Sequence, residues 1–235
     1  MIVRPASGRL QLITQPDHAA AARAIMEHWP PLQSATRRDS ILLAVREHDN
    51  GWRELDEAPS VDPDRGTVFD FLTLPLEQRQ GVWPRGVDRL AGHDQWAAAL
   101  VAHHAVFVYH RYRGQPAWSP FFHALETRRD ALVSACGNST SDLISDYAFL
   151  RIGDLISLTF CTRMTDEQAF DGWTFRLDGD RVLVTPDVLN GRDISFAVVA
   201  REVADVPYRS DSELRAAVRA GRTVTLNAVL CASPS

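Results

Sequence analysis

The sequence predicts a mainly α-helical protein, a helical bundle followed by a small mixed β region, which makes the fold class α+β overall. Two observations support this prediction. Before about residue 170, apolar residues recur at helical spacing in successive segments. Beyond that point the pattern changes to short alternating runs around turn residues, as in strands. We therefore expect a helical metal-binding domain over residues 1–168 and a small C-terminal α/β appendage, packed on it, over residues 169–235.

The helical part is expected to begin after one short strand. Residues 1–13 alternate loosely and include the run GRLQLIT. The next segment, TQPDHAAAARAIMEHW, predicts a helix, because Pro16 suits a first turn and Asp17 suits the positive N-terminal end. A second helix is expected over residues 37–49, where several apolar residues and His48 share one face.

A long loop separates these helices from the next ones. Residues 50–74 contain Gly66, two prolines and several aspartates without periodicity, which indicates a loop laid over the core. Asp94 is the expected N-cap of a strong helix. Four further helices are predicted, over about residues 75–90 (interrupted near WPRG), 94–112, 116–136 and 140–164, the last capped by Thr140 or Ser141.

The C-terminal region has a different pattern. WTFRL-DGD-RVLVT indicates a hairpin around a glycine-containing turn. DISFAVVAREVADVPY and TVTLNAVLC are strand-like, and SDSELRAAVRAG predicts a short capped helix between them. This region contains no histidine, so we expect it to pack against the bundle or to contribute to a homodimer rather than to carry catalysis.

Charge and composition exclude several classes of partner. The formal net charge of −5 gives no basis for binding nucleic acid or an anionic membrane. All 25 basic residues are arginine, which removes lysine Schiff-base chemistry and any lysine general base. Cys136, Cys161 and Cys231 are far apart and odd in number, so we expect neither a disulfide framework nor a cysteine zinc site. Without a signal-peptide pattern or an apolar run near ~18 residues, a cytoplasmic protein is expected.

Histidines and aspartates occur in an ordered series on separate predicted helices. One pair ends the second helix, in the run AVREHDNGW, and another lies midway along the helix that contains LVAHHAVFVY. An aspartate also interrupts the apolar run RIGDLISL near the end of the helical region. In chain order the series is His18, His48, Asp49, His103, His104 and Asp154.

Each of these residues taken alone has a structural explanation. Asn50 and Gly51 are residue types that end helices, because glycine tolerates the left-handed conformation, and a histidine suits the helix C-terminus. Asp154 can pair with Arg151, one turn earlier. A carboxylate in an apolar run nevertheless costs several kcal/mol unless an arginine or a metal compensates it.

Taken together, the series resembles the HD superfamily of metal enzymes: a His, then a His-Asp pair, then one or more His, then an Asp, each on its own helix. Imidazole and carboxylate ligands together favour Mn, Fe, Co, Ni or Zn over Ca. Ligands from separate helices of a bundle converge on its interior. The resemblance therefore implies an HD-like helical domain that holds one or two divalent transition-metal ions.

A narrower resemblance covers nearly the whole chain. QPDHA at a helix start, EHDNGW at a helix end, LVAHHAVFVY and LRIGDLISLTFC, in this order, resemble a bacterial family catalogued as domain of unknown function 3891. The family name carries no activity, so the resemblance implies a fold and a site rather than a reaction. By position, it implies that His18, His48, Asp49 and Asp154 hold one metal and that His104 serves a second.

The predicted site favours a metal-dependent hydrolase that cleaves a small phosphoester or related small molecule with metal-activated water. Asp49, Glu47 or Asp56 could accept a proton. Arg151 or Arg53 could hold a phosphate through two hydrogen bonds. The candidate catalytic residues are Asp49 and Arg151, and the candidate substrate-binding residues are Trp52, Arg53 and His103.

Two other functions use the same residues. A di-iron oxygenase would use the same ligands and an apolar pocket for a small organic substrate, although tryptophans are equally ordinary core residues. A non-enzymatic HD-like binding or regulatory protein is the third possibility, against which the full ligand set argues. The aromatic residues that could line the pocket are Trp52, Phe69, Phe71, Trp83, Trp96 and Trp118.

Overall fold

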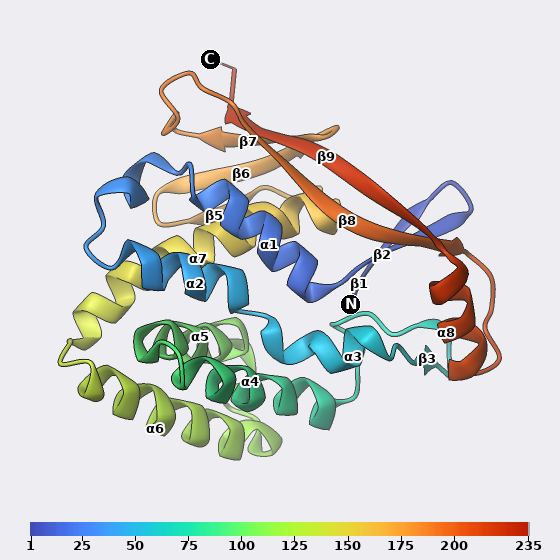
Figure 1. Ribbon diagram of the computed structural model, residues 1–235, viewed down its shortest axis with the longest axis horizontal. Coiled ribbons are helices and arrows are strands. Elements are labelled where there is room, and N and C mark those ends of the chain that lie inside the picture. Colours follow the sequence, from blue (N-terminus) through green and yellow to red (C-terminus); the bar gives the residue numbers. More distant parts are fainter. Residues whose placement is uncertain (235) are drawn as a thin grey trace.

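A curled, seven-stranded mixed sheet covers a stack of helices in the computed structural model, which describes residues 1–234 (Figure 1). The strands of this sheet are β1 (Ile2–Ala6), β2 (Arg9–Ile13), β5 (Gln168–Phe170), β6 (Trp173–Asp178), β7 (Arg181–Thr185), β8 (Ile194–Ala204) and β9 (Arg222–Ala232). Their spatial order is β1-β2-β8-β9-β7-β6-β5. Neighbouring strands are antiparallel except for β7 and β9, which are parallel. A small second sheet pairs β3 (Val61–Asp62) with β4 (Thr67–Val68).

The described residues form eight α-helices and four short 3-10 helices. The α-helices are α1 (Gln15–Met26), α2 (Arg38–Glu47), α3 (Arg53–Glu57), α4 (Leu76–Ala91), α5 (Gln95–Val108), α6 (Ser119–Ala135), α7 (Thr140–Cys161) and α8 (Asp211–Ala220). The 3-10 helices are η1 (Pro30–Ser34), η2 (Asn50–Trp52), η3 (His110–Tyr112) and η4 (Pro116–Trp118).

The helices lie in layers beneath the sheet (Figure 1). α1 packs on β8, and α7 packs on β5, β6 and β7. α2 packs on α1, α5 and α7, while α5 also contacts α4 and α6. In Figure 1, α6 lies farthest from the sheet. The helices α1, α2, α5 and α7 thus meet in the interior, below the sheet, where their side chains belong to one large apolar core.

The prediction of a mainly α, HD-like helical bundle with a small β region is wrong. Helices make up about 51% of the structure, and the seven-stranded sheet, shaped like half a barrel, is a major part of the fold. The sheet also contains the N-terminal hairpin, because β2 pairs with β8, with Arg9 opposite Ala204. Local alternation can mark a strand, but it does not identify a partner strand so distant in sequence. Strands from both predicted domain ranges share this sheet, and the division of the chain near residue 168 stays a prediction.

The predicted helices themselves are confirmed, and their caps explain where they begin. Thr14 caps α1 and Asp94 caps α5, each by accepting a backbone N–H in the first turn. α7 begins at Thr140 and is capped by Ser139 rather than by Thr140 or Ser141 as predicted, because Ser139 and Asp142 form a capping box. α4 continues through Pro84 without the interruption predicted near WPRG. Pro84 is exposed, so water can reach the carbonyl that its ring leaves without a donor.

Gly51, in the motif EHDNGW, is required for packing rather than for a left-handed turn. Its φ is not positive, which corrects the helix-ending role expected from the sequence. A Cβ at this position would overlap the carbonyl oxygen of Val82 in α4. Gly86 completes the contact from the other side, since its own Cβ would lie 3.3 Å from the backbone nitrogen of Gly51. The two glycines therefore let α4 lie directly against η2, next to the predicted metal ligands.

Among residues 1–234, no helix combines the length and the apolar character needed to cross a membrane.

Candidate metal centre

Four helical segments bring the predicted ligands together below the sheet. His18 lies in the first turn of α1, His48 follows the last residue of α2, Asp49 precedes η2, and Asp154 lies in the middle of α7. His104, on α5, completes the group. All five side chains are buried, and the most exposed of them, Asp49, is only 5% exposed. Such burial of ionisable groups requires compensation from one another or from a bound ion.

Four ligand atoms of this group form a compact cluster. His18 Nε2 lies 3.2 Å from His48 Nε2, 3.2 Å from Asp154 Oδ1 and 3.5 Å from Asp49 Oδ2. His48 Nε2 lies 3.4 Å from Asp49 Oδ2 and 3.5 Å from Asp154 Oδ1. In a tetrahedral site with metal–ligand bonds of about 2.1 Å, neighbouring ligand atoms lie about 3.4 Å apart. Each of these five distances therefore matches the spacing between ligand atoms bound to one metal ion, whereas Asp49 and Asp154 fall in separate groups of mutually close ligands.

Hydrogen bonds outside the cluster fix the orientation of two of its imidazoles. His48 Nδ1 lies 2.8 Å from the carbonyl oxygen of Val45, which can only accept, so Nδ1 carries the proton. Ser157 donates its hydroxyl hydrogen to the carbonyl oxygen of Asp154 at 3.0 Å and can accept from His18 Nδ1 at 2.8 Å. With each ring in this tautomer, Nε2 carries the lone pair and points at the other ligand atoms, as in metal-binding histidines.

The pKa shifts of His48, Asp49 and Asp154 favour positive charge within the cluster. Burial acts to lower the pKa of His48, but Asp49 and Asp154 outweigh burial and hold this pKa well above its usual value. Burial acts to raise the pKa of Asp154, but hydrogen bonds from His18 and His48 hold it well below its usual range. The pKa of Asp49 is lowered in the same way, against burial, mainly by His48. A cation among these atoms would supply the same charge.

The donor set therefore fits a divalent transition-metal ion. The Nε2 atoms of His18 and His48 each lie within 3.5 Å of an oxygen of Asp49 and of Asp154, and the remaining ring nitrogens have partners of their own. Nitrogen and oxygen ligands of this kind suit Mn, Fe, Co, Ni or Zn. The buried histidines and aspartates could hold such an ion.

His104 belongs to a second, overlapping group with His48 and Asp154. Its Nε2 lies 3.7 Å from Asp154 Oδ2, the carboxylate oxygen that is not part of the compact cluster. Burial lowers the pKa of His104 to about 3, so its ring is neutral. Arg151 also donates to Asp154 Oδ2, at 2.5 Å. A second ion at this position would thus have to compete with a guanidinium group.

A cavity of about 370 Å³ opens onto both groups. Three members of these groups line it, namely Asp49, His104 and Asp154. Three arginines line it, namely Arg79, Arg111 and Arg151. Its aromatic lining consists of Trp52, Phe71, Trp83, Phe107 and Tyr109. This volume is at the lower end of the range for small-molecule sites, which are mostly apolar with a few polar groups.

Two of the predicted substrate-binding residues lie away from this cavity. Arg53 lines a different hollow, is paired with Glu47 at 3.9 Å, and has a side chain that is 53% exposed. His103 packs edge-on against Tyr147, and burial lowers its pKa to about 4. Trp52 does line the cavity. Adjacent residues of a helix point about 100° apart, which is why His103 and His104 face different surroundings.

Several residues of the site carried no signal that the sequence analysis used. Arg79 lies near the start of α4 and Arg111 lies in η3, and in the sequence neither is next to a ligand. Ser157 could have been found, because it lies three residues after Asp154, on the same face of a helix.

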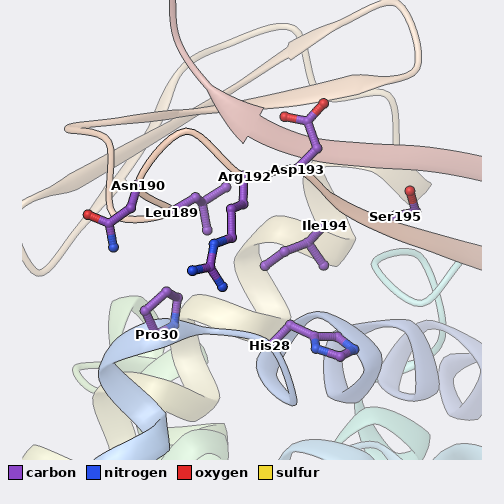
Figure 2. A pocket seen from close by; sticks show the side chains of 8 residues that line it. All are labelled: His28, Pro30, Leu189, Asn190, Arg192, Asp193, Ile194 and Ser195. Carbon is purple, nitrogen blue, oxygen red and sulfur yellow. The ribbon is translucent and has the colours of Figure 1, made fainter.

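A separate cavity of about 440 Å³ lies between the end of α1 and the loop before β8 (Figure 2). His28 and Pro30 line one side, and residues 189, 190 and 192–195 line the other. Figure 2 shows Arg192 extending from that loop into the space above Pro30 and His28. His28 and Arg192 are exposed, and no residue of the metal cluster takes part. This cavity therefore lacks the buried polar groups that mark the first one.

Fold and site together define a mixed helix-and-sheet protein with buried His/Asp groups that could hold a metal ion. The chain belongs to the family described as protein of unknown function (DUF3891), whose model matches residues 1–204. This match confirms the resemblance noted in the sequence, although it ends with β8 and does not extend over α8 and β9. No curated protein and no solved structure matches the chain.

Proposed function

We propose that the protein is a metal-dependent hydrolase that cleaves a small phosphoester or a related anionic small molecule with metal-activated water. One observation carries the proposal: the four-atom cluster adjoins a cavity whose other charged lining residues are three arginines. A divalent ion bound there would neutralise charge on phosphoryl oxygens and lower the pKa of water towards neutrality. Overall, water adds to phosphorus, the ester P–O bond breaks, and an alcohol and a phosphate leave.

The protein's own residues would hold and orient the reacting groups. His18, His48, Asp49 and Asp154 would bind the ion through the four clustered atoms. Arg151 fixes Asp154 Oδ2 and borders the cavity, so the same guanidinium can hold a phosphoryl oxygen.

A di-iron oxygenase is the second candidate, and the aromatic lining of the cavity favours it. Such an enzyme needs two ions, and the second would depend on His104 and on Asp154 Oδ2. Because Arg151 already occupies that oxygen, a single ion and hydrolysis account better for the contacts. A binding or regulatory protein that holds the metal without catalysis is the remaining alternative.

Metal content measured beside hydrolysis tests the proposal. We expect about one Mn, Fe, Co, Ni or Zn ion per chain by elemental analysis, and release of phosphate or alcohol from a panel of phosphoesters. His18→Ala and Asp154→Asn should lose both, while His103→Ala, a neighbouring histidine outside the cluster, should keep both. Two irons per chain with substrate-dependent oxygen uptake would favour the oxygenase. Failure to bind any of these metals would overturn the ligand assignment.

A further inference from the structure

We propose that the substrate is amphiphilic: a phosphomonoester of an apolar alcohol, with the phosphate beside the metal cluster and the apolar group on Leu72 and Phe107 at the rim of the cavity. This inference rests on the proposed function and adds the substrate class to it. It is carried by two unpaired arginines, by a buried donor without an acceptor, and by the exposed apolar side chains at the rim.

Two of the three arginines of the cavity are not engaged in ion pairs, whereas Arg151 pairs with Asp154. Within residues 1–234, neither Arg79 nor Arg111 has a carboxylate within 4.0 Å. Arg79 is half-buried, and its Nε atom is buried without a hydrogen-bond partner among the described residues. Arg111 is exposed and lies over the ring of Tyr112. Guanidinium groups held in this way suit a phosphate, whose oxygens accept paired hydrogen bonds.

The charge of the lining favours a dianion over a neutral ligand. Its three guanidinium groups outnumber the carboxylates of Asp49 and Asp154, even before a cation binds. Trp52 adds a neutral donor, because its side chain is 1% exposed and its indole N–H has no acceptor among the described residues. A buried donor of this kind is costly unless a ligand or a water satisfies it.

The rim of the cavity is apolar and exposed. Among the described residues, five large hydrophobic side chains are exposed, and two of them, Leu72 (57%) and Phe107 (41%), line this cavity. Phe107 lies against Tyr147 and beneath the guanidinium of Arg151, with ring and cation 5.8 Å apart. Phe107 thus adjoins both the charged lining and the solvent, so a ligand with its charge inside would place its apolar group on this rim.

Binding of phosphonates, which cannot be hydrolysed at the P–C bond, tests the inference. We would titrate methylphosphonate, hexylphosphonate, hexanoate and hexanol into the metal-loaded and the metal-free protein by calorimetry. Hexylphosphonate should bind at least about tenfold more tightly than methylphosphonate, and hexanol should not bind. Equal affinity for the two phosphonates would overturn the apolar contact, and hexanoate binding as tightly as hexylphosphonate would overturn the choice of phosphate.

Variants of the lining locate the contacts. The double substitution Leu72→Ser and Phe107→Ser should bring the affinity for hexylphosphonate towards that for methylphosphonate. Arg79→Gln and Arg111→Gln should each weaken both phosphonates about tenfold. Ile144→Ser and Arg192→Gln are matched controls, because Ile144 is 56% exposed outside the cavity and Arg192 lines the separate one. A loss of affinity in the controls as large as in the cavity variants would contradict the assignment.

The outcomes separate this inference from the proposed function. Chain-length preference in phosphonate binding, without hydrolysis of any phosphomonoester, would support the inference while overturning the hydrolase. Hydrolysis of small polar phosphomonoesters, with no preference for hexyl phosphate, would support the hydrolase and overturn the inference.

Discussion

Two buried aspartates on α7 show how differently one helix can use the same side chain. Asp146 is 6% exposed and Asp154 is 2% exposed, and each accepts a hydrogen bond from an arginine, Arg37 or Arg151, at 2.5 Å. Asp146 accepts its remaining bond from the indole N–H of Trp96 at 2.9 Å. Asp154 instead faces the Nε2 atoms of three histidines.

The difference lies in the balance of donors and acceptors. Both described hydrogen-bond partners of Asp146 donate to its Oδ2, so this carboxylate oxygen is satisfied by the protein itself, as is typical of a structural role. Around Asp154, two of the facing nitrogens belong to rings whose protons are committed to Val45 and Ser157. The carboxylate oxygens of Asp154 and the Nε2 atoms that face them are then all acceptors, and this arrangement needs additional protons or a cation. Burial alone would not distinguish the two aspartates, but the accounting of hydrogen bonds does.

The largest expected effect comes from removing a ligand of the cluster. Loss of a residue that only supports a ligand typically costs 10–100-fold in metal affinity, so loss of His48 itself should cost roughly 10³-fold or more. Elemental analysis and phosphoester hydrolysis of His48→Ala measure this loss. A His48→Ala protein that retains its metal would contradict the assignment of Asp154 and its neighbours as metal ligands, and Asp154 would then not differ in role from Asp146.

Loss of the structural aspartate should act on stability alone. Asp146→Ala leaves the partly buried guanidinium of Arg37 and the indole of Trp96 without their acceptor, which should lower the free energy of unfolding by about 2–4 kcal/mol. Urea denaturation gives this value. Metal content should not change, and a protein that lost metal without losing stability would show that Asp146 belongs to the centre.

Removal of the metal should destabilise the protein, because the excess acceptors around Asp154 would then face one another. At a free metal concentration 100 times the dissociation constant, the ion should contribute about 2.7 kcal/mol. Thermal unfolding with and without a chelator measures the difference. The Asp154→Asn protein is the control, since its melting temperature should not respond to the chelator.

The smallest effect is expected at Ser157, which orients His18 without touching the ion. Ser157→Ala removes the acceptor of His18 Nδ1 and should weaken metal binding by about 10–100-fold. Competition with a chromophoric chelator measures the affinity. Thr159→Val is a matched control on the same helix, since among residues 1–234 the Thr159 hydroxyl bonds only to the carbonyl of Leu155; an equal loss there would indicate a general effect on α7.

The helices and the cluster could be predicted because their signals are local or ordered along the chain. Caps such as Asp94 and the apolar periodicity located the helices to within a few residues. The ligand series depended only on which residue types occur in which helix, and such an order survives an error in the fold class.

The sheet and two of the three cavity arginines, Arg79 and Arg111, could not be predicted, because both depend on contacts distant in sequence. β2 joins β8 across most of the chain, and no pattern in residues 9–13 specifies that partner. Of the two sequence candidates for holding phosphate, Arg151 lines the cavity and Arg53 lines a different hollow, whereas Arg79 lines the cavity without having been a candidate. α4, which contains Arg79, packs on η2 at Gly51 and Gly86. This is a tertiary contact, and no local sequence pattern specifies it.

The order of strands in the sheet also bears on how the chain folds during its synthesis. β9 lies between β8 and β7, so it joins two three-stranded halves, β1-β2-β8 and β7-β6-β5, although it is the last strand to leave the ribosome. Until then each half presents one unpaired inner edge, the kind of edge that invites pairing with another chain. The helical layer that carries the ligands is complete well before that point, so the metal centre could assemble on a nascent chain whose sheet is still open.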